Sequence, residues 1–226
     1  MALRPLLIAG FALLAVVIAF TGWAWVQIPD TALIATHWDL NDHVNGHMHK
    51  IPGLLIGPAI MVALLIFFWA ITKIEPRRNN LTRSRTFFAV GFAGGLAIAA
   101  LAQIHVVLTA LGISTPVLQT VLPAVATLVI VMGNFMGKTR SNFFVGVRTP
   151  WTLESDHSWE KTNRWAGRFF IFSGVATLVA LIVSTKAVAV GILVGTLVAS
   201  ALVSVVLSYV FWKQDPTRHA HDSVPE

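Results

Sequence analysis

Cysteine is absent, so the chain forms no disulfide and offers no thiolate as a metal ligand or nucleophile. Charge is also scarce: only 12% of the 226 residues are charged, against about 25% in a typical soluble domain. Apolar residues make up 56% of the chain, and its mean hydropathy is +0.74. A globule of this size has too little interior to hide so much apolar surface. The composition therefore predicts an integral membrane protein.

The apolar residues gather in six stretches that are long enough to cross a bilayer, which takes about 20 residues each. We predict spans at about 5–26, 53–72, 87–111, 117–137, 167–185 and 187–212. The first is not read as a secretory signal, because GWAWVQIPD after it is a poor cleavage site. The predicted fold class is an all-α integral membrane protein, a bundle of about six transmembrane helices with an interfacial cytoplasmic amphipathic helix.

The basic residues predict the orientation of this bundle. Fourteen of the sixteen fall in loops on one side of the predicted spans, and only Lys50 and Lys186 fall on the other. Because cytoplasmic loops are enriched in Lys and Arg, both termini are expected in the cytoplasm. The formal net charge of +6 then fits contact with the bilayer and its anionic headgroups, with no direct binding of nucleic acid.

A dense polar and aromatic stretch, GVRTPWTLESDHSWEKTNRW, occupies residues 146–165, in the predicted cytoplasmic loop between spans four and five. Thr149 before Pro150 is typical of a helix start, with a hydroxyl cap and proline in the first turn. Ser155 or Asp156 is suited to cap a second helical segment. This segment is amphipathic, so we expect it to lie at the headgroup level and turn into span five.

The side chains of this predicted amphipathic helix divide by face. Trp159 shares one face with Thr162, whereas Glu160 and Arg164 are spaced to pair on another. The tryptophans at 151, 159 and 165 are expected in the membrane interface, where indole is half apolar and half polar. Arg148 and Arg164 are suited to hold a lipid phosphate or a partner carboxylate in a fork geometry.

Catalytic chemistry is not indicated by the sequence. His157 lies among Glu154, Asp156 and Glu160, but such a cluster on an exposed helix is typical of a solvated face. No nucleophile–base–orienter set, phosphate-binding glycine loop or pair of buried carboxylates is evident. We therefore predict that the protein is not an enzyme. An alternative, a lipid-modifying enzyme at the Arg148–Arg164 loop, requires a cleft in which Glu154 or Glu160 activates water.

A spaced motif runs from span four into span five. It reads GN-(3)-K-(3)-N-(3)-G-x-RTPWTL, followed by W-x-x-T-x-R-x-x-G, and it begins at Gly133 and ends at Gly167. This pattern resembles the signature of the SdpI family of bacterial membrane proteins, and the resemblance is strong over about 120–212. The residues that the resemblance marks for the motif and for partner docking are Asn134, Lys138, Asn142, Arg148, Thr149, Pro150, Trp151, Thr152, Trp159, Thr162 and Arg164.

The first external loop resembles the small domain of unknown function that often precedes this module in the family. The shared features are a proline-led extended segment from Ile28, His37 with Trp38 after it, and a turn at Val44-Asn45-Gly46 leading to Lys50. The domain boundaries that we predict are a two-helix N-terminal unit with the external loop at 1–75, a basic linker and third span at 76–116, an SdpI-like module at 117–212 and a polar cytoplasmic tail at 213–226.

The resemblance also implies a function and partners. The best-known family member gives its host immunity to a secreted peptide toxin that attacks the cytoplasmic membrane, and it holds a small transcriptional repressor at the membrane once toxin is sensed. We therefore expect a multi-pass inner-membrane protein for immunity or stress protection, with a membrane-active peptide toxin and a cytoplasmic transcriptional regulator as partners. A homo-oligomer is left open.

Four of the eight histidines lie in the first external loop, THWDLNDHVNGHMHK. Imidazole and carboxylate ligands suit zinc or another divalent metal, and the candidate ligands are His37, Asp39, His43, His47 and His49. A pH-responsive loop and a hydrated loop in which His37 satisfies local hydrogen bonds are the other interpretations.

Two polar residues, Gln103 and His105, fall inside the third span. An intramembrane ionisable residue is a functional candidate, but His105 is near enough to the external end to reach interfacial water. Asn134 is expected to tie Arg148 or the Thr149-Pro150 turn to the bundle. The alternative function is a small-solute or metal transporter, or a metal-responsive sensor, and a polar path from His37 past His105 to Asn134 would favour it.

Overall fold

The computed structural model describes residues 4–217, with the exception of the side chain of Arg78. Six long apolar helices in this range are each able to cross a membrane by length and composition. They are α1 (Arg4–Trp25), α2 (Lys50–Ile74), α4 (Arg85–Ala110), α5 (Val117–Met136), α7 (Asp156–Val183) and α8 (Lys186–Lys213). The predicted all-α multi-pass membrane fold is confirmed. The last part of the predicted polar tail, 218–226, lies outside the described residues.

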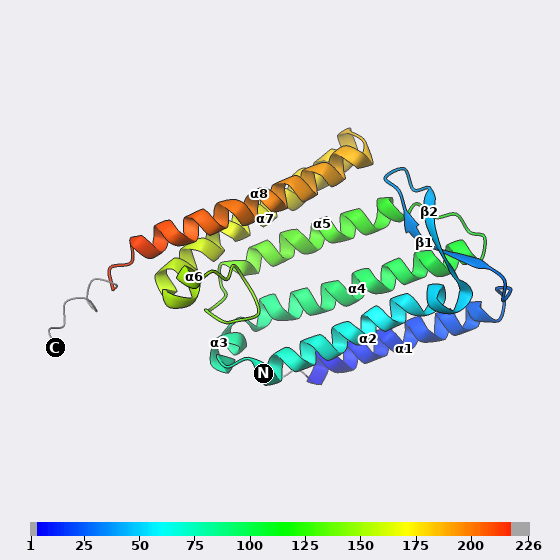
Figure 1. The fold of residues 1–226 in the computed structure, drawn as a ribbon, viewed down its shortest axis with the longest axis horizontal. Helices are drawn as coiled ribbons and strands as arrows, with labels where there is room; N and C mark the ends of the chain where they lie inside the picture. Colours follow the sequence, from blue (N-terminus) through cyan, green and yellow to red (C-terminus); the bar gives the residue numbers. More distant parts are fainter. Residues whose placement is uncertain (1–3, 218–226) are drawn as a thin grey trace.

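The long helices lie side by side and run the length of the molecule (Figure 1). Helices α1, α2 and α4 pack together, α5 lies between α4 and α7, and α8 packs against α7. Two short helices, α3 (Arg78–Arg83) and α6 (Pro150–Glu154), lie at the same end as the start of α1. We call this end, which carries most of the basic residues, the basic end. The opposite end, which carries two strands, is the hairpin end.

Apolar packing holds the first three long helices together. Leu14 of α1, Met61 and Leu65 of α2, and Phe92 and Leu96 of α4 form one buried cluster. Large apolar side chains on the outside of the same helices remain exposed, among them Phe11 and Ile66. In a soluble protein such exposure would drive association, but in a bilayer these side chains contact lipid.

The loop between α1 and α2 forms a two-stranded antiparallel hairpin of β1 (Leu33–Trp38) and β2 (Val44–His49). Ile34 is fully buried and packs against Gly53, where a Cβ atom would meet it at 2.6 Å. Lys50, at the start of α2, is also buried, and its ammonium group donates to the carbonyl of Ile28 and to the carboxylate of Asp30, both at 2.7 Å. Lys50 therefore fastens the hairpin base to α2.

The structure corrects one detail of the predicted loop between spans four and five. The amphipathic segment forms the first turns of α7, which continues unbroken from Asp156 to Val183, so the segment turns directly into span five as expected. Trp159 is not an interfacial anchor, because only 1% of its surface is exposed. Its indole is covered by the preceding loop, whereas Trp165 remains exposed as expected.

Candidate functional site

The segment from Gly137 to Ser155, here called the RTPWTL loop, connects α5 to α7 at the basic end. Its first turn is built around Asn142, which is fully buried. The side-chain oxygen of Asn142 accepts hydrogen bonds from the amides of Phe144 and Val145 at 2.9 and 2.8 Å, and its amide group donates to the carbonyl of Arg140 at 2.7 Å. One side chain thus satisfies three backbone groups of the turn.

Helix α6 begins as the sequence predicts. The Thr149 hydroxyl accepts from the amide of Thr152, and the Thr152 hydroxyl accepts from the amide of Thr149, which completes a capping box with Pro150 in the first turn. The Thr149 hydroxyl also donates to Ser208 of α8 at 3.0 Å. Trp151 lies edge-on to Tyr209, with ring centroids 5.2 Å apart. These contacts fix α6 against α8.

The RTPWTL loop is also bound to the first turns of α7. Asn163 is fully buried, and its side-chain oxygen accepts from the amide of Val147 at 2.7 Å. The indole of Trp159 donates to the carbonyl of Thr139 at 3.1 Å. Gly146 has a φ of +95°, and a Cβ there would lie 2.6 Å from the Asn163 oxygen, so glycine is required both by conformation and by space.

The loop is joined from the other side by the linker between α2 and α4, residues 75–84. Glu75 has no exposed surface, and its two carboxylate oxygens accept from the amides of Arg77 and Phe143 at 2.8 and 3.0 Å. The Arg77 guanidinium donates to the Ser141 hydroxyl and to the carbonyl of Leu153. The N-terminal helices are therefore held to the RTPWTL loop by polar contacts.

Two further contacts extend this joint. Asn80 donates to the carbonyl of Ser141 at 2.8 Å, and the hydroxyl of Ser84 accepts from the amide of Arg140 at 2.9 Å. The partners are separated by 61 and 56 residues in the sequence. No local sequence pattern marks the linker residues as part of the site, because their partners lie so far away in the sequence.

Helices α5 and α7 approach closely where two glycines face each other. A Cβ on Gly133 would lie 2.6 Å from the carbonyl oxygen of Gly167, and a Cβ on Gly167 would lie 2.5 Å from that of Gly133. Neither position has room for a side chain. The two glycines of the motif therefore bring the first half of α7 against the end of α5, directly beneath the RTPWTL loop.

The remaining motif residues are exposed, with the exception of the buried Thr162. Asn134 is exposed on α5, so the expected tie from Asn134 to Arg148 or to the α6 turn is wrong; Asn142 and Asn163 hold the loop instead. Arg148 is exposed and donates to the carbonyl of Phe143 at 2.8 Å. Arg164 pairs with Glu160, as predicted, and both are half exposed. Thr162 is buried, with no hydrogen-bond partner for its hydroxyl among the described residues.

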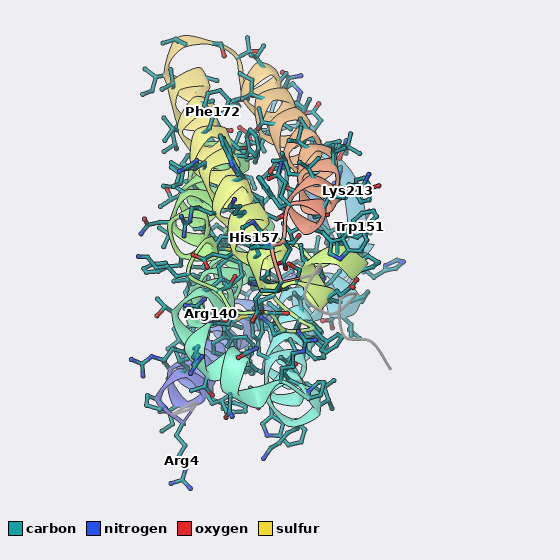
Figure 2. All side chains as sticks on the ribbon, turned by 90° about the vertical axis from the view of Figure 1, so that its left-hand side faces the viewer. Arg4, Arg140, Trp151, His157, Phe172 and Lys213 are labelled. Carbon is teal, nitrogen blue, oxygen red and sulfur yellow. The ribbon has the colours of Figure 1, made fainter. Side chains whose placement is uncertain are left out.

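A polar cavity of about 620 Å³ opens at the basic end beside the joint. Its lining comes from the 75–84 linker, the junction of α6 with α7 and the segment after α8, and it includes Arg77, Glu154, His157 and Asp215. In Figure 2, which views the molecule from this end, Arg140 and His157 lie near the middle, while Trp151 and Lys213 lie toward one edge. The cavity mixes one guanidinium with several carboxylates, so it suits a polar partner of mixed charge.

Asp215 closes the base of this cavity. Its carboxylate accepts from the hydroxyl of Ser155, the N-cap of α7, and from the amide of Thr217 at 2.9 Å. The hydrogen bond from Ser155 lowers the pKa of Asp215 below its ordinary value, with smaller contributions from Thr217 and from the charge of His157. The segment after α8 is thereby fixed to the start of α7.

Comparison with known proteins is consistent with this geometry. Residues 138–211, which contain most of the RTPWTL loop with α7 and nearly all of α8, match the SdpI/YfhL protein family. This part of the chain is therefore similar to the SdpI/YfhL family. One curated relative, Immunity protein SdpI of Bacillus subtilis (strain 168), is 25% identical over 153 residues, covering 59% of this chain and 72% of the relative. No solved structure matches the chain.

At the hairpin end, the four histidines of the loop between α1 and α2 do not form a preformed metal site. His37, His43, His47 and His49 are all exposed. His37 contacts the side-chain oxygen of Asn45 at 2.5 Å, and His43 lies 3.5 Å from Asp39. Within residues 4–217, no three His, Asp or Glu side chains are grouped to hold a metal ion. The contact of His37 is the local hydrogen bond that one of the sequence interpretations expects.

Asp42, at the hairpin tip, has a role that the sequence analysis missed. It has a left-handed φ of +66°. One carboxylate oxygen accepts from the amide of Leu118 at the start of α5 at 2.7 Å, and the other is paired with the ammonium group of Lys186 at the start of α8. The carboxylate side chain is only 11% exposed. The hairpin is thus clamped to the starts of α5 and α8.

The two predicted intramembrane polar residues are both buried. Gln103 donates to the hydroxyl of Thr21 at 3.2 Å and to the carbonyl of Leu54 at 2.9 Å, so it links α4 to α1 and α2. His105 contacts the hydroxyls of Thr115 and Thr120 at 2.7 and 2.5 Å. His105 is only 5% exposed and is held by these threonines at the hairpin end, rather than opening to interfacial water.

The polar path that would favour a transporter is not formed within the described residues. Toward the basic end, the buried positions of α4 beyond Gln103 are Ala100, Leu96, Phe92, Phe88 and Phe87. Asn134, the inner end of the expected path, is exposed on α5 rather than directed into the bundle. His105 and Asn134 are therefore separated by apolar packing.

Proposed function

We propose that this protein is an immunity protein of the bacterial cytoplasmic membrane that protects its host against a membrane-active peptide. The observation that carries the proposal is the joint at the basic end, where the family motif in the RTPWTL loop is bound to both halves of the chain. The name of the Bacillus subtilis relative, Immunity protein SdpI, supports the same function. The residues of the joint serve packing and backbone hydrogen bonding, which suits a receptor or shield better than a catalyst.

In the proposed orientation the basic end lies in the cytoplasm and the hairpin end lies outside. The distribution of Lys and Arg supports this orientation. We further propose that the chain divides as the sequence indicates, into an N-terminal unit at 1–75, a linker with the third span at 76–116, and a module at 117–212. The 75–84 linker and the Asp42 clamp join these units at the two ends.

This arrangement supports a sensing function as well as protection. A peptide that disturbs the hairpin end would act on the Asp42 clamp, and α7 and α8 run from that clamp to the RTPWTL loop. The polar cavity beside the loop is then the proposed docking surface for a cytoplasmic regulator. Its mixed charge suits a protein partner that offers both a carboxylate for Arg77 and a cation for Glu154 and Asp215.

The function is tested by deleting the gene and measuring survival across a panel of membrane-active peptides. We expect the deletion strain to be sensitised, wild-type complementation to restore resistance, and Arg148→Ala to restore it incompletely. Arg148 is suited to this test because its exposed side chain can be removed without opening the core. Lys161→Ala removes another exposed cation at the same end and is the matched control. Equal survival of the deletion and parent strains with every peptide would contradict the proposal.

The orientation has a separate test, since the chain contains no cysteine. Single cysteines at the exposed positions Asn41 and Lys161 would report the hairpin end and the basic end. An impermeant maleimide added to intact spheroplasts is expected to label Asn41→Cys and to leave Lys161→Cys unlabelled until the cells are lysed. The reverse pattern would overturn the orientation without bearing on the fold.

A further inference from the structure

A small cleft of about 170 Å³ opens at the basic end between the first turn of α4 and the last turn of α5. Its lining combines two cationic side chains, two hydroxyl side chains and two aromatic rings. The lining residues are Arg83, Ser84, Thr86, Phe87, Phe135 and Lys138. This cleft is separate from the polar cavity beside the RTPWTL loop, with which it shares no lining residue.

The charge of the cleft is positive and uncompensated. No carboxylate lines it, and within residues 4–217 no carboxylate forms an ion pair with Arg83 or Lys138. The ammonium group of Lys138 lies 5.1 Å from the centroid of the Phe135 ring. Arg164, which the sequence made a candidate for phosphate binding, is instead neutralised by Glu160. Arg83 and Lys138 are therefore the better-placed cations for an anion.

The depth of the cleft in the membrane limits what can occupy it. Helix α4 begins at Arg85 and α5 ends at Met136, so the cleft lies where two apolar spans meet the headgroup region. The first turn of α4 has no side-chain cap, and its helix dipole adds positive potential there. The rings of Phe87 and Phe135 give the same cleft an apolar wall. An anion attached to an apolar body fits both features.

We propose that this cleft binds the phosphate of an anionic phospholipid from the cytoplasmic leaflet. Arg83 and Lys138 contact the phosphate, and the two phenylalanine rings contact the glycerol and the upper acyl chains. Asn134, exposed one helical turn deeper on α5, faces the level of the ester groups. The site gives a role to Asn134 and Lys138, two motif residues that take no part in holding the RTPWTL loop. An acidic protein segment fits less well, because part of the cleft wall is apolar and lies at the edge of the bilayer.

Native mass spectrometry of the full-length protein in mild detergent tests this site, with phosphatidylglycerol and phosphatidylcholine as the two probes. We expect wild type to prefer phosphatidylglycerol and the double variant Arg83→Gln, Lys138→Gln to bind it about tenfold or more weakly, since each cation near an anionic headgroup contributes about 1 kcal/mol. The matched control, Lys161→Gln with Lys213→Gln, removes two cations at the same end outside the cleft and is expected to retain the preference.

Two further arms make the outcome decisive. Arg83→Lys with Lys138→Arg keeps both charges and is expected to retain binding, which separates charge from any effect on folding. Excess inorganic phosphate is expected to leave phosphatidylglycerol bound; displacement of the lipid by phosphate would assign the cleft to a free anion and overturn the lipid proposal. Equally weakened binding of phosphatidylglycerol by the cleft variant and the control variant would show that general surface electrostatics attracts the lipid. That result would also overturn the lipid proposal.

Discussion

Glu75 offers the sharpest test of the joint at the basic end. Its buried carboxylate accepts from two backbone amides, of which one, that of Phe143, belongs to the RTPWTL loop. Glu75→Ala leaves both amides without this acceptor in a buried site. At about 1.5–3 kcal/mol for each hydrogen bond to a charged group, the expected loss is about 3–5 kcal/mol, since such losses are not fully additive. In a chain of this length, a loss of that size lowers Tm by roughly 6–20 °C.

The assay is thermal unfolding of the purified protein in detergent, followed by the fluorescence of its eight tryptophans. Glu75→Gln keeps one acceptor oxygen and turns a donor toward the second amide, so we expect an intermediate decrease in Tm. Glu154→Gln removes an exposed carboxylate at the same end and is expected to leave Tm unchanged. If Glu75→Ala unfolds within about 2 °C of wild type, the reasoning that the linker and the loop form one joint is refuted.

Three further variants test other parts of the structure in the same assay. Gly167→Ala places a Cβ 2.5 Å from the carbonyl oxygen of Gly133, so we expect it to lower the free energy of unfolding by about 1–3 kcal/mol. Gly95→Ala is the control, because a Cβ there meets nothing within 4 Å, and we expect it not to destabilise the protein. Equal effects of the two variants would contradict the close approach of α5 and α7. Asp42→Asn tolerates the positive φ but loses its charge, so we expect about 1–3 kcal/mol of destabilisation. Because the pKa of Asp215 is lowered in the folded protein, its ionised carboxylate stabilises the fold. This stabilisation is complete above about pH 4 and is lost as pH falls through the lowered pKa. Asp215→Asn should therefore be less stable than wild type at pH 7 and should approach it in acid; a constant difference would refute this.

Local signals predicted much of the fold. The spans follow from runs of apolar residues, and five of the six helices begin and end within about three residues of expectation. The starts of α6 and α7 follow from hydroxyl caps at Thr149 and Ser155, whose hydrogen bonds lie within three residues. The pair of Glu160 with Arg164 follows from helical spacing. In each case the interacting groups are neighbours in the sequence.

The rest of the candidate site depends on contacts between distant residues. Glu75 and Phe143 are 68 residues apart, and Asp42 and Lys186 are 144 apart, so no periodicity or spacing indicates that they meet. The half-apolar, half-polar indole of Trp159 predicts a place in the interface, but Trp159 is buried because the RTPWTL loop folds over it. The motif thus identifies residues of the site from the sequence, whereas the residues that they contact are identified only by the folded structure.

Protection of a membrane from a peptide by this chain has its clearest test in the transfer of the gene to a susceptible host. Survival is measured against the dose of each peptide in a panel, in cells that express the chain and in cells that carry an empty vector. We expect the chain to raise the lethal dose of at least one membrane-active peptide. Superimposable dose–survival curves for every peptide, with the protein present in the membrane fraction, would contradict it.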